Sequence, residues 1–207
     1  MSKVLLINGS PHINGCTSTA LDIVAEELQR GNVDTETVHI GHKDIRGCIA
    51  CRKCKETGRC VFNDIVNELK PKFEHADGLV VGSPVYFAGP NGTLTNLLDR
   101  LFFSASCSLR MKVGAAVVSA RRAGTTAALD RLNKYFQLAE MPIASSRYWN
   151  MVHGNTAEEV MKDEEGIQIM RVLGRNMAFL IRAIAKERER CGLPKVDLMR
   201  INTNFIR

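Results

Sequence analysis

The sequence has little of the features that mark several special classes of protein. No apolar run approaches the length of a membrane span, which is about 18 residues. The first apolar run covers only residues 4–7, which is too short for the core of a signal peptide. With 6% aromatic residues, the chain also lacks the long basic face with interleaved aromatics that favours nucleic-acid binding. We therefore expect a cytoplasmic protein that binds neither a membrane nor nucleic acid.

The rest of the composition is that of an ordinary globular protein. Apolar residues make up 45% and charged residues 24% of the chain. A chain of this size buries roughly 70% of its unfolded surface, so it needs no disulfides in order to fold. We find no internal repeat or linker and predict one domain over residues 1–207. The net charge of +6 indicates a solvated basic surface that also attracts anionic cofactors or acidic electron carriers.

Short strand-like segments alternate with helical ones along the chain. Strands are expected at residues 3–8, 35–40, 78–83, 112–120 and 141–149. Helices are expected at 17–30, 63–75, 92–103, 125–139 and about 164–189, with a kink or break at Pro71. The nearly continuous apolar strands are typical of a parallel sheet that is buried on both faces. We predict an α/β fold, a doubly wound five-stranded parallel sheet with helices on both faces and ligands beyond the carboxyl ends of its strands.

The loop after the first strand, "NGSPHINGCTS" (8–18), has the composition of a phosphate cradle. Gly9 and Gly15 allow tight turns, and the following helix begins with free N–H groups. Hydroxyl groups come from Ser10, Thr17 and Ser18. A Walker loop is excluded because Cys16, not Lys, follows Gly15, and the G-x-G-x-x-G fingerprint is absent. A bound monophosphate fits best, and the alternative is a capped loop without a ligand.

Two further loops follow the third and fourth strands. The first, "GSPVYFAGPNG" (82–92), is rigid and partly apolar and suits a planar ring, or is a structural turn with Tyr86 and Phe87 in the core. The second, "SARRAGTT" (119–126), offers Gly124 and hydroxyl groups to the edge of the same ligand. Its two arginines are alternatively surface charges. Whether residues 148–160 cover this site is left open.

With these loops, nearly the whole chain resembles the flavodoxin-like NADPH-dependent FMN reductases. The markers are "GSPHINGCTS", where the family typically shows GSPR-x-x-G-N-[ST], and "GSPVYFAGPNGTLTNLLDR". The resemblance implies that the FMN phosphate is held by Ser10, His12, Asn14, Thr17 and Ser18. It implies that the isoalloxazine ring contacts Pro84, Val85, Tyr86, Phe87 and Gly89. It also implies that the polar edge of this ring contacts Ser119, Arg121 and Gly124. His12 stands in place of Arg and Cys16 in place of Asn in this FMN-binding loop, so we expect weaker or more pH-dependent phosphate binding.

Four cysteines stand close together in the loop at 47–60, which we expect at the same carboxyl edge as the phosphate cradle. Their spacing is Cys48-x2-Cys51-x2-Cys54-x5-Cys60. Structural zinc sites usually pair two CxxC knuckles across about a dozen residues or more, whereas ligands at every third residue are typical of [4Fe–4S] loops. Reactive thiols, a redox disulfide such as Cys51–Cys54, and zinc remain alternatives. The other three cysteines have no such spacing and are interpreted as buried structural thiols.

The cysteine motif is also similar to that of the iron–sulfur flavoproteins within this group, which carry a [4Fe–4S] cluster beside FMN. The resemblance implies an FMN-dependent oxidoreductase that passes electrons between NAD(P)H, or a one-electron carrier such as ferredoxin, and an acceptor. We name no catalytic side chain, because flavin chemistry does not demand one. The alternatives are a cluster-free NAD(P)H:FMN or quinone reductase, and a flavodoxin-like electron carrier. A homodimer or homotetramer is expected from the resemblance and from apolar residues at 101–109 and on the last helix.

Overall fold

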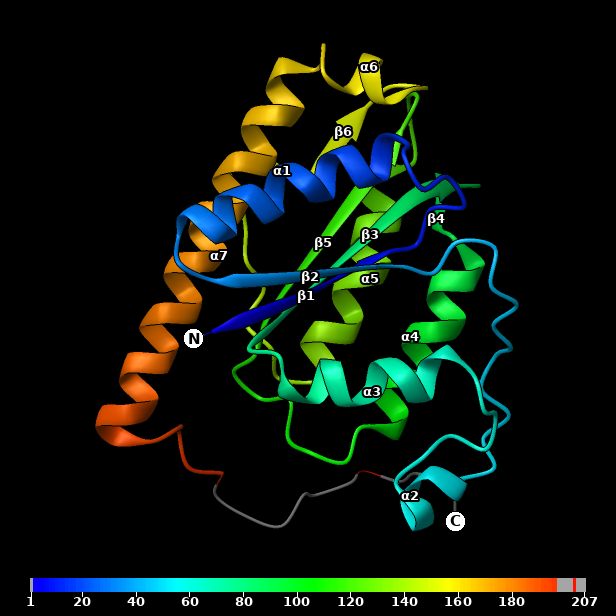
Figure 1. The fold of residues 1–207 in the computed structure, drawn as a ribbon, viewed down its shortest axis with the longest axis vertical. Coiled ribbons are helices and arrows are strands. Elements are labelled where there is room, and N and C mark those ends of the chain that lie inside the picture. The colour runs from blue at the N-terminus through cyan, green and yellow to red at the C-terminus, as the bar shows by residue number, and fades with distance from the viewer. Residues whose placement is uncertain (1, 197–202, 204–207) are drawn as a thin grey trace.

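Five parallel strands form the centre of the molecule, in the order β2-β1-β3-β5-β6 (Figure 1). The computed structural model describes residues 2–196 and residue 203. The parallel strands are β1 (Lys3–Asn8), β2 (Asp34–His39), β3 (Gly78–Tyr86), β5 (Val113–Ala120) and β6 (Met151–His153). A further two-residue strand, β4 (Gly89–Pro90), pairs antiparallel with the end of β3. The strand order reverses beside β1, which makes the sheet doubly wound as predicted.

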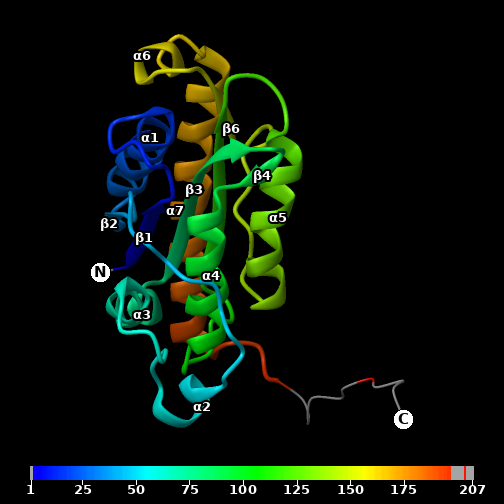
Figure 2. The same cartoon turned by 90° about the vertical axis from the view of Figure 1, so that its right-hand side faces the viewer.

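Helices cover both faces of this sheet, and Figure 2 shows α1 and α5 on opposite sides of it. One face carries α1 (Cys16–Arg30) and α7 (Glu164–Cys191). The other carries α3 (Ile65–His75), α4 (Gly92–Ser104) and α5 (Thr125–Leu138). Two short helices, α2 (Lys53–Thr57) and α6 (Ala157–Val160), lie in loops and were not predicted. The predicted fold class is confirmed.

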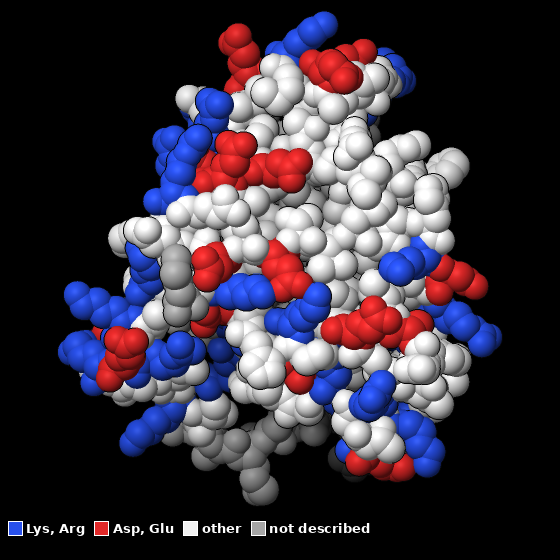
Figure 3. Space-filling view, viewed as in Figure 1, with Lys and Arg blue, Asp and Glu red and all other residues white. Residues whose placement is uncertain are grey.

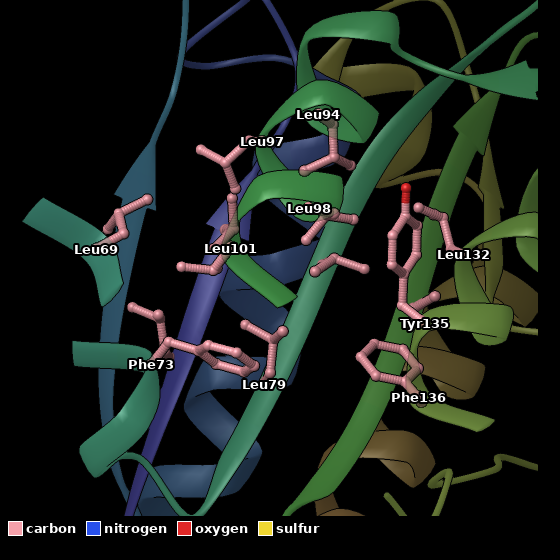
Figure 4. Close-up of a cluster of buried hydrophobic side chains, with 14 of the residues drawn as sticks. Leu69, Phe73, Leu79, Leu94, Leu97, Leu98, Leu101, Leu132, Tyr135 and Phe136 are labelled. Atoms are coloured by element: carbon pink, nitrogen blue, oxygen red, sulfur yellow. The ribbon is translucent and has the colours of Figure 1, made fainter. Parts of the chain in front are cut away.

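Alternate residues of the strands enter two separate apolar cores. Leu5 and Ile7 of β1 belong to the core under α3, α4 and α5, whereas Val4 and Leu6 belong to the core under α1 and α7. Figure 4 shows the first of these cores, where leucines of α4 lie against β3. Full burial of one such side chain contributes about 1.5–3 kcal/mol. Burial on both faces explains why these strands have nearly continuous apolar sequences.

The fifth parallel strand does not lie where the sequence predicted it. Only an isolated bridge between Gly114 and Ile143 falls within 141–149. The chain then contacts α7, where Ser146 Oγ donates to the carbonyl oxygen of Ile169 at 2.7 Å. It pairs with β5 again from Met151 onward. The prediction was wrong because hydrogen bonds to α7 replace the sheet ladder over these residues.

The break expected at Pro71 is also absent, since α3 continues through it to His75. Leu69 and Phe73, on either side of the proline, are both buried in the core. Their packing holds the two halves of the helix against the sheet despite the missing N–H group.

The apolar stripe of α7 is used inside the chain. Its buried residues pack with α1 in one core; they are Ile167, Ile169, Met170, Leu173, Met177, Ala178 and Ile181. Gly174 allows this close approach, because a Cβ there would lie 2.7 Å from the Cβ of Glu27. The stripe therefore gives no support to the oligomer prediction, which now depends on 101–109. None of the helices in the described part of the chain combines the length and apolar character that crossing a membrane requires.

Candidate functional site

The 8–18 loop is drawn close to the end of β3. Gly9 N donates to the carbonyl oxygen of Gly82 at 2.8 Å. A Cβ on Gly9 would lie 2.9 Å from the Cβ of Leu94, so a side chain does not fit at this position. Ser10 N donates to Asn8 Oδ1 at 2.9 Å, which fixes the turn that follows. The backbone of the loop is thus set by a contact with the end of β3 and by the side chains of Asn8 and Ser10, since His12 N donates to Ser10 Oγ at 3.1 Å.

The loop leads into α1 at an end suited to an anion. Gly15 caps the helix without a side-chain hydrogen bond, and the first turn holds no acidic residue. Ser18 Oγ donates to the carbonyl oxygen of Gly15 at 2.9 Å. Thr17 Oγ1 and Ser119 Oγ lie 2.8 Å apart and share a hydrogen bond that ties the helix to β5. The N–H groups and the positive end of the helix dipole therefore face the space beyond the strands.

That space is an open hollow of about 480 Å³, which we call the strand-end hollow. Its volume is within the range of about 300–1,000 Å³ that is usual for small-molecule sites. Of the residues predicted to bind the cofactor, it is lined by Ser10, His12, Asn14, Cys16, Thr17, Pro84, Val85, Tyr86, Ser119 and Arg121. It is also lined by Gly154, Asn155, Thr156, Ala157 and Glu158, which follow β6 and were not assigned from the sequence. Residues from four loops thus meet at the carboxyl edge of the sheet, and their binding roles stay predictions.

Four predicted residues lie outside the lining of this hollow. The Ser18 side chain turns back to the carbonyl oxygen of Gly15. Phe87 and Gly89 belong to the β3–β4 hairpin, and Gly124 packs against it. Phe87 and Ala88 have φ angles of 50° and 60°, which is the geometry of a two-residue hairpin turn. A Cβ on Gly124 would lie 2.9 Å from the Cα of Ala88, so this glycine lets α5 approach the hairpin.

The surface on one side of the strand-end hollow has few charges, although Arg121 and Glu158 belong to the lining of the hollow itself. Figure 3 shows a largely uncharged region over the β3–β4 hairpin and the start of α1, at the upper right. Ile13, Tyr86 and Phe87 of these segments are exposed. The alternative in which Tyr86 and Phe87 belong to the core is therefore wrong. An apolar rim of this kind suits a planar aromatic ligand.

Cys16 joins the 8–18 loop to the segment that follows β6. Its Sγ donates to the carbonyl oxygen of Gly154 at 3.4 Å. Burial raises the pKa of the Cys16 thiol, and the carboxylates of Glu159 and Glu158 raise it further. Cys16 is therefore a neutral packing residue of the site. The same interpretation is wrong for Cys107 and Cys191, which are exposed.

The cysteine loop does not stay at the carboxyl edge. After β2 it runs along α4, where Asn96 Nδ2 donates to the carbonyl oxygen of Ile45 at 3.0 Å and Arg100 Nη1 to that of Arg46 at 3.2 Å. Figures 1 and 2 show that it reaches α2 at the far end of α4 from the β3–β4 hairpin. The expected placement beside the phosphate cradle was wrong, because these hydrogen bonds guide the loop along the helix.

At that end the four cysteines line one small hollow, which we call the cysteine hollow. Its lining is Cys48, Ile49, Cys51, Arg52, Cys54, Cys60, Val61, Phe62, Arg100, Phe103 and Ser104. Left-handed backbone at Ala50, Arg52 and Gly58 curls the loop around it. All seven cysteines are free. Among the residues that the structure describes, no group of three or more Cys, His, Asp or Glu side chains has a metal-binding arrangement.

The strand order and the phosphate-suited loop at the carboxyl edge define a flavodoxin-like nucleotide-binding protein. Solved structures agree on the fold: RosB with a bound riboflavin-phosphate derivative has a TM-score of 0.71 at 14% identity, covering 99% of this chain and 92% of that chain. An NADH:FMN oxidoreductase, EMOB, has a TM-score of 0.61 at 17% identity, covering 88% and 90%.

Sequence comparisons identify the family. The model of the NADPH-dependent FMN reductase family matches residues 2–156. An iron–sulfur flavoprotein of Methanocaldococcus jannaschii is 32% identical over 196 residues, covering 89% of this chain and 100% of its own. One from Methanosarcina thermophila is 26% identical over 193 residues, covering 91% and 100%. The chain belongs to the NADPH-dependent FMN reductase family, in its iron–sulfur flavoprotein subgroup.

Family membership confirms several predictions. The chain is an FMN-dependent flavoprotein oxidoreductase and an NAD(P)H-dependent, FMN reductase-like enzyme. FMN is therefore its cofactor. The cluster, the electron acceptor and the site residues are taken up below as proposals.

Proposed function

We propose that this flavoprotein passes electrons between reduced NAD(P) and a one-electron carrier, with FMN in the strand-end hollow and a [4Fe–4S] cluster in the cysteine hollow. When bound, FMN supplies hydride and single-electron transfer, and the cluster supplies a one-electron port. The observation that carries the proposal is that Cys48, Cys51, Cys54 and Cys60 all line one hollow. Their thiols form the soft donor set that iron–sulfur clusters require.

The residues of the strand-end hollow fit FMN. The N-terminus of α1, which has no side-chain cap, and the hydroxyl group of Ser10 suit the phosphate. Pro84, Val85 and Tyr86 present apolar surface to the ring. Arg121 adds a cation to the lining of the hollow. These groups bind and orient the cofactor, and no side chain is assigned a proton-transfer role.

The cysteine hollow fits an anionic cluster in charge and polarity. Ile49, Val61 and Phe103 add apolar side chains to its lining, although each of them is exposed to solvent. Arg52 and Arg100 bring positive charge into its lining, and Lys53 and Lys55 lie on the adjoining α2. Arg52 and Lys55 offset part of the negative charge of four thiolates around a cluster, whereas Arg100 and Lys53 are paired with Asp64 and Glu56. The assignment of the four cysteines as cluster ligands depends on the chemistry of their thiol groups.

A second candidate is a cluster-free NAD(P)H:FMN or quinone reductase. It is favoured by the separation of the two hollows, which lie at opposite ends of α4. This helix has 13 residues, or about 20 Å at 1.5 Å per residue. The strand-end hollow is therefore complete without the cysteine loop.

We further propose a homodimer or homotetramer and an acidic electron carrier such as ferredoxin as partners. A groove of about 920 Å³ between α4 and α5 adjoins the cysteine hollow and contains the exposed Phe103 and Leu138. Lys55, Arg131 and Lys134 line the same groove and favour acidic partners. The cytoplasmic location remains a prediction, since a reducing compartment suits a thiolate-bound cluster. Light scattering tests the oligomer, and a monomer would contradict it.

The experiment is an ultraviolet–visible spectrum of anaerobically purified protein, paired with iron and acid-labile sulfide analysis. We expect flavin bands over a broad cluster absorption and about four irons per chain. Cys51→Ser should lose iron and keep FMN, whereas the exposed Cys191→Ser is the matched control and should keep both. A flavin spectrum without iron would leave the cluster-free reductase.

A further inference from the structure

Arg100 of α4 is the largest fully buried side chain among the described residues, with 1% of the side chain exposed. The end of its guanidinium donates to both carboxylate oxygens of Asp64, with Nη1–Oδ2 at 2.7 Å and Nη2–Oδ1 at 2.8 Å. Nη1 also donates to the carbonyl oxygen of Arg46, and the Cζ atom lies 5.0 Å from the centroid of the Phe62 ring. A buried guanidinium this well paired is fixed in one orientation.

The side of the same guanidinium faces Cys60. Nε and Nη2 lie 3.3 Å and 3.2 Å from Cys60 Sγ, and both donate to it. A neutral thiol is a weak acceptor, and Asp64 already neutralises the charge of Arg100. Two guanidinium N–H groups directed at one sulfur therefore mark a position prepared for an anionic sulfur.

The backbone of Cys60 is held as firmly as its sulfur. Cys60 N donates to Asn67 Oδ1 at 2.9 Å, and Asn67 Nδ2 donates back to the carbonyl oxygen of Cys60 at 3.0 Å. Cys48 and Cys51, in contrast, are exposed on the loop. Cys60 is thus the cysteine of the hollow that α3 and α4 fix in advance.

We propose that Arg100 positions Cys60 as a cluster ligand and raises the reduction potential of the cluster, whereas Asp64 lowers that potential. This inference rests on the proposed function, in which the four cysteines hold the cluster. Hydrogen bonds to ligand sulfur and a nearby positive charge stabilise the more negative reduced cluster. The negative charge of the half-buried Asp64 carboxylate disfavours the same form. The two members of one ion pair therefore act on the potential in opposite directions.

The test is a redox titration of the anaerobic, cluster-loaded protein, with dithionite as the one-electron reductant and no atoms gained or lost by the cluster. Arg100→Gln should shift the midpoint potential to more negative values, and Asp64→Asn to more positive values. Asparagine keeps the side-chain oxygen that caps α3 at Val66, so the fold is expected to survive. Arg100→Lys keeps the charge without the two-donor fork and should lie between wild type and Arg100→Gln.

Arg46→Gln is the matched control. Arg46 stacks on the same Phe62 ring, with Cζ 4.9 Å from its centroid, but it is exposed, so solvent screens its charge. Its shift should be smaller than that of Arg100→Gln. The FMN content of every variant should match wild type, because the strand-end hollow is at the other end of α4.

The outcomes separate this inference from the proposed function. A wild type that takes up no iron overturns both. A wild type with about four irons, but with the same potential in Arg100→Gln and Asp64→Asn, overturns the role of Arg100 alone. Shifts of both variants in one direction also overturn it, because a merely structural ion pair predicts equivalent damage from either side. If Arg100→Gln loses its iron, Asp64→Asn and Arg100→Lys decide the question.

Discussion

The two hollows are held in place by different kinds of contact. In the strand-end hollow the contacts that hold the loop close to β3 are made by backbone, such as Gly9 N to the carbonyl oxygen of Gly82. In the cysteine hollow they are made by side chains of α3 and α4, namely Asn67, Arg100 and Asn96, which hold a loop. A backbone-built site is sensitive to steric change, whereas a side-chain-built site is sensitive to loss of single polar groups.

The largest expected effect is from Gly9→Val, which tests the backbone-built site. The new side chain would meet the Cβ of Leu94 and the carbonyl oxygen of Gly82. Overpacking of about 1–3 kcal/mol should weaken FMN binding by about 5- to 150-fold, as measured by flavin fluorescence titration. Gly92→Ala is the control, because a Cβ at Gly92 meets nothing within 4 Å. Unchanged affinity in Gly9→Val would contradict this account of the loop.

Asn67→Ala is expected to damage the side-chain-built site. It leaves Cys60 N without its acceptor, at a cost of about 1–3 kcal/mol. Iron per chain should fall while FMN affinity stays at the wild-type value. Asn63→Ala is the control, since Asn63 is exposed and has only a 3.5 Å contact with Arg59. Equal iron contents in the two variants would show that the clamp on Cys60 is unimportant.

A smaller effect is expected from Thr17→Val, which removes a polar contact from the backbone-built site. It breaks the 2.8 Å hydrogen bond to Ser119 Oγ but keeps the shape of the side chain. A loss of about 1 kcal/mol corresponds to about fivefold weaker FMN binding in the same titration. Thr19→Val, which removes only the bond to the carbonyl oxygen of Gly15, should bind FMN nearly as wild type. If Thr17→Val weakened FMN binding as much as Gly9→Val does, the strand-end hollow would depend on side-chain contacts as much as on backbone contacts.

The smallest expected effect is on the pH dependence of the unfolding free energy, through Cys16 in the lining of the strand-end hollow. Burial raises the pKa of Cys16 above its ordinary value of 9.0, so the folded state holds the thiol proton more tightly than the unfolded state. The resulting stability is present below that ordinary value and is lost as the pH rises through the folded pKa. As the pH rises above 9.0, wild type should lose more unfolding free energy than Cys16→Ala in urea titrations. Equal losses of unfolding free energy in wild type and Cys16→Ala would show that the Cys16 thiol does not couple stability to pH.

The sequence predicted the strand-end hollow better than the cysteine hollow, for a physical reason. Ser10, Thr17 and Tyr86 stand next to the strands that place them, so local pattern is enough to locate them. The position of the cysteine loop depends on Asn96 and Arg100, whose contacts with residues about 50 positions away have no local signal.

Whether residues 148–160 reach the site was left open from the sequence for a related reason, and residues 154–158 do line the hollow. Their place at the hollow depends on where β6 ends, and β6 was predicted too early because hydrogen bonds to α7 displace residues 146–149 from the sheet. The contact of Phe87 with the flavin ring stays a prediction from the resemblance, and the two-residue turn of the β3–β4 hairpin leaves this side chain exposed at the rim. The error in the position of β6 comes from tertiary contacts that override the local pattern.

The most direct test of the account measures flavin and iron in the same anaerobic preparations of wild type, Gly9→Val and Cys60→Ser. The account predicts FMN and about four irons per chain in wild type, loss of FMN with iron retained in Gly9→Val, and loss of iron with FMN retained in Cys60→Ser. A wild type without iron, or a single variant that loses both FMN and iron while folded, would contradict the account.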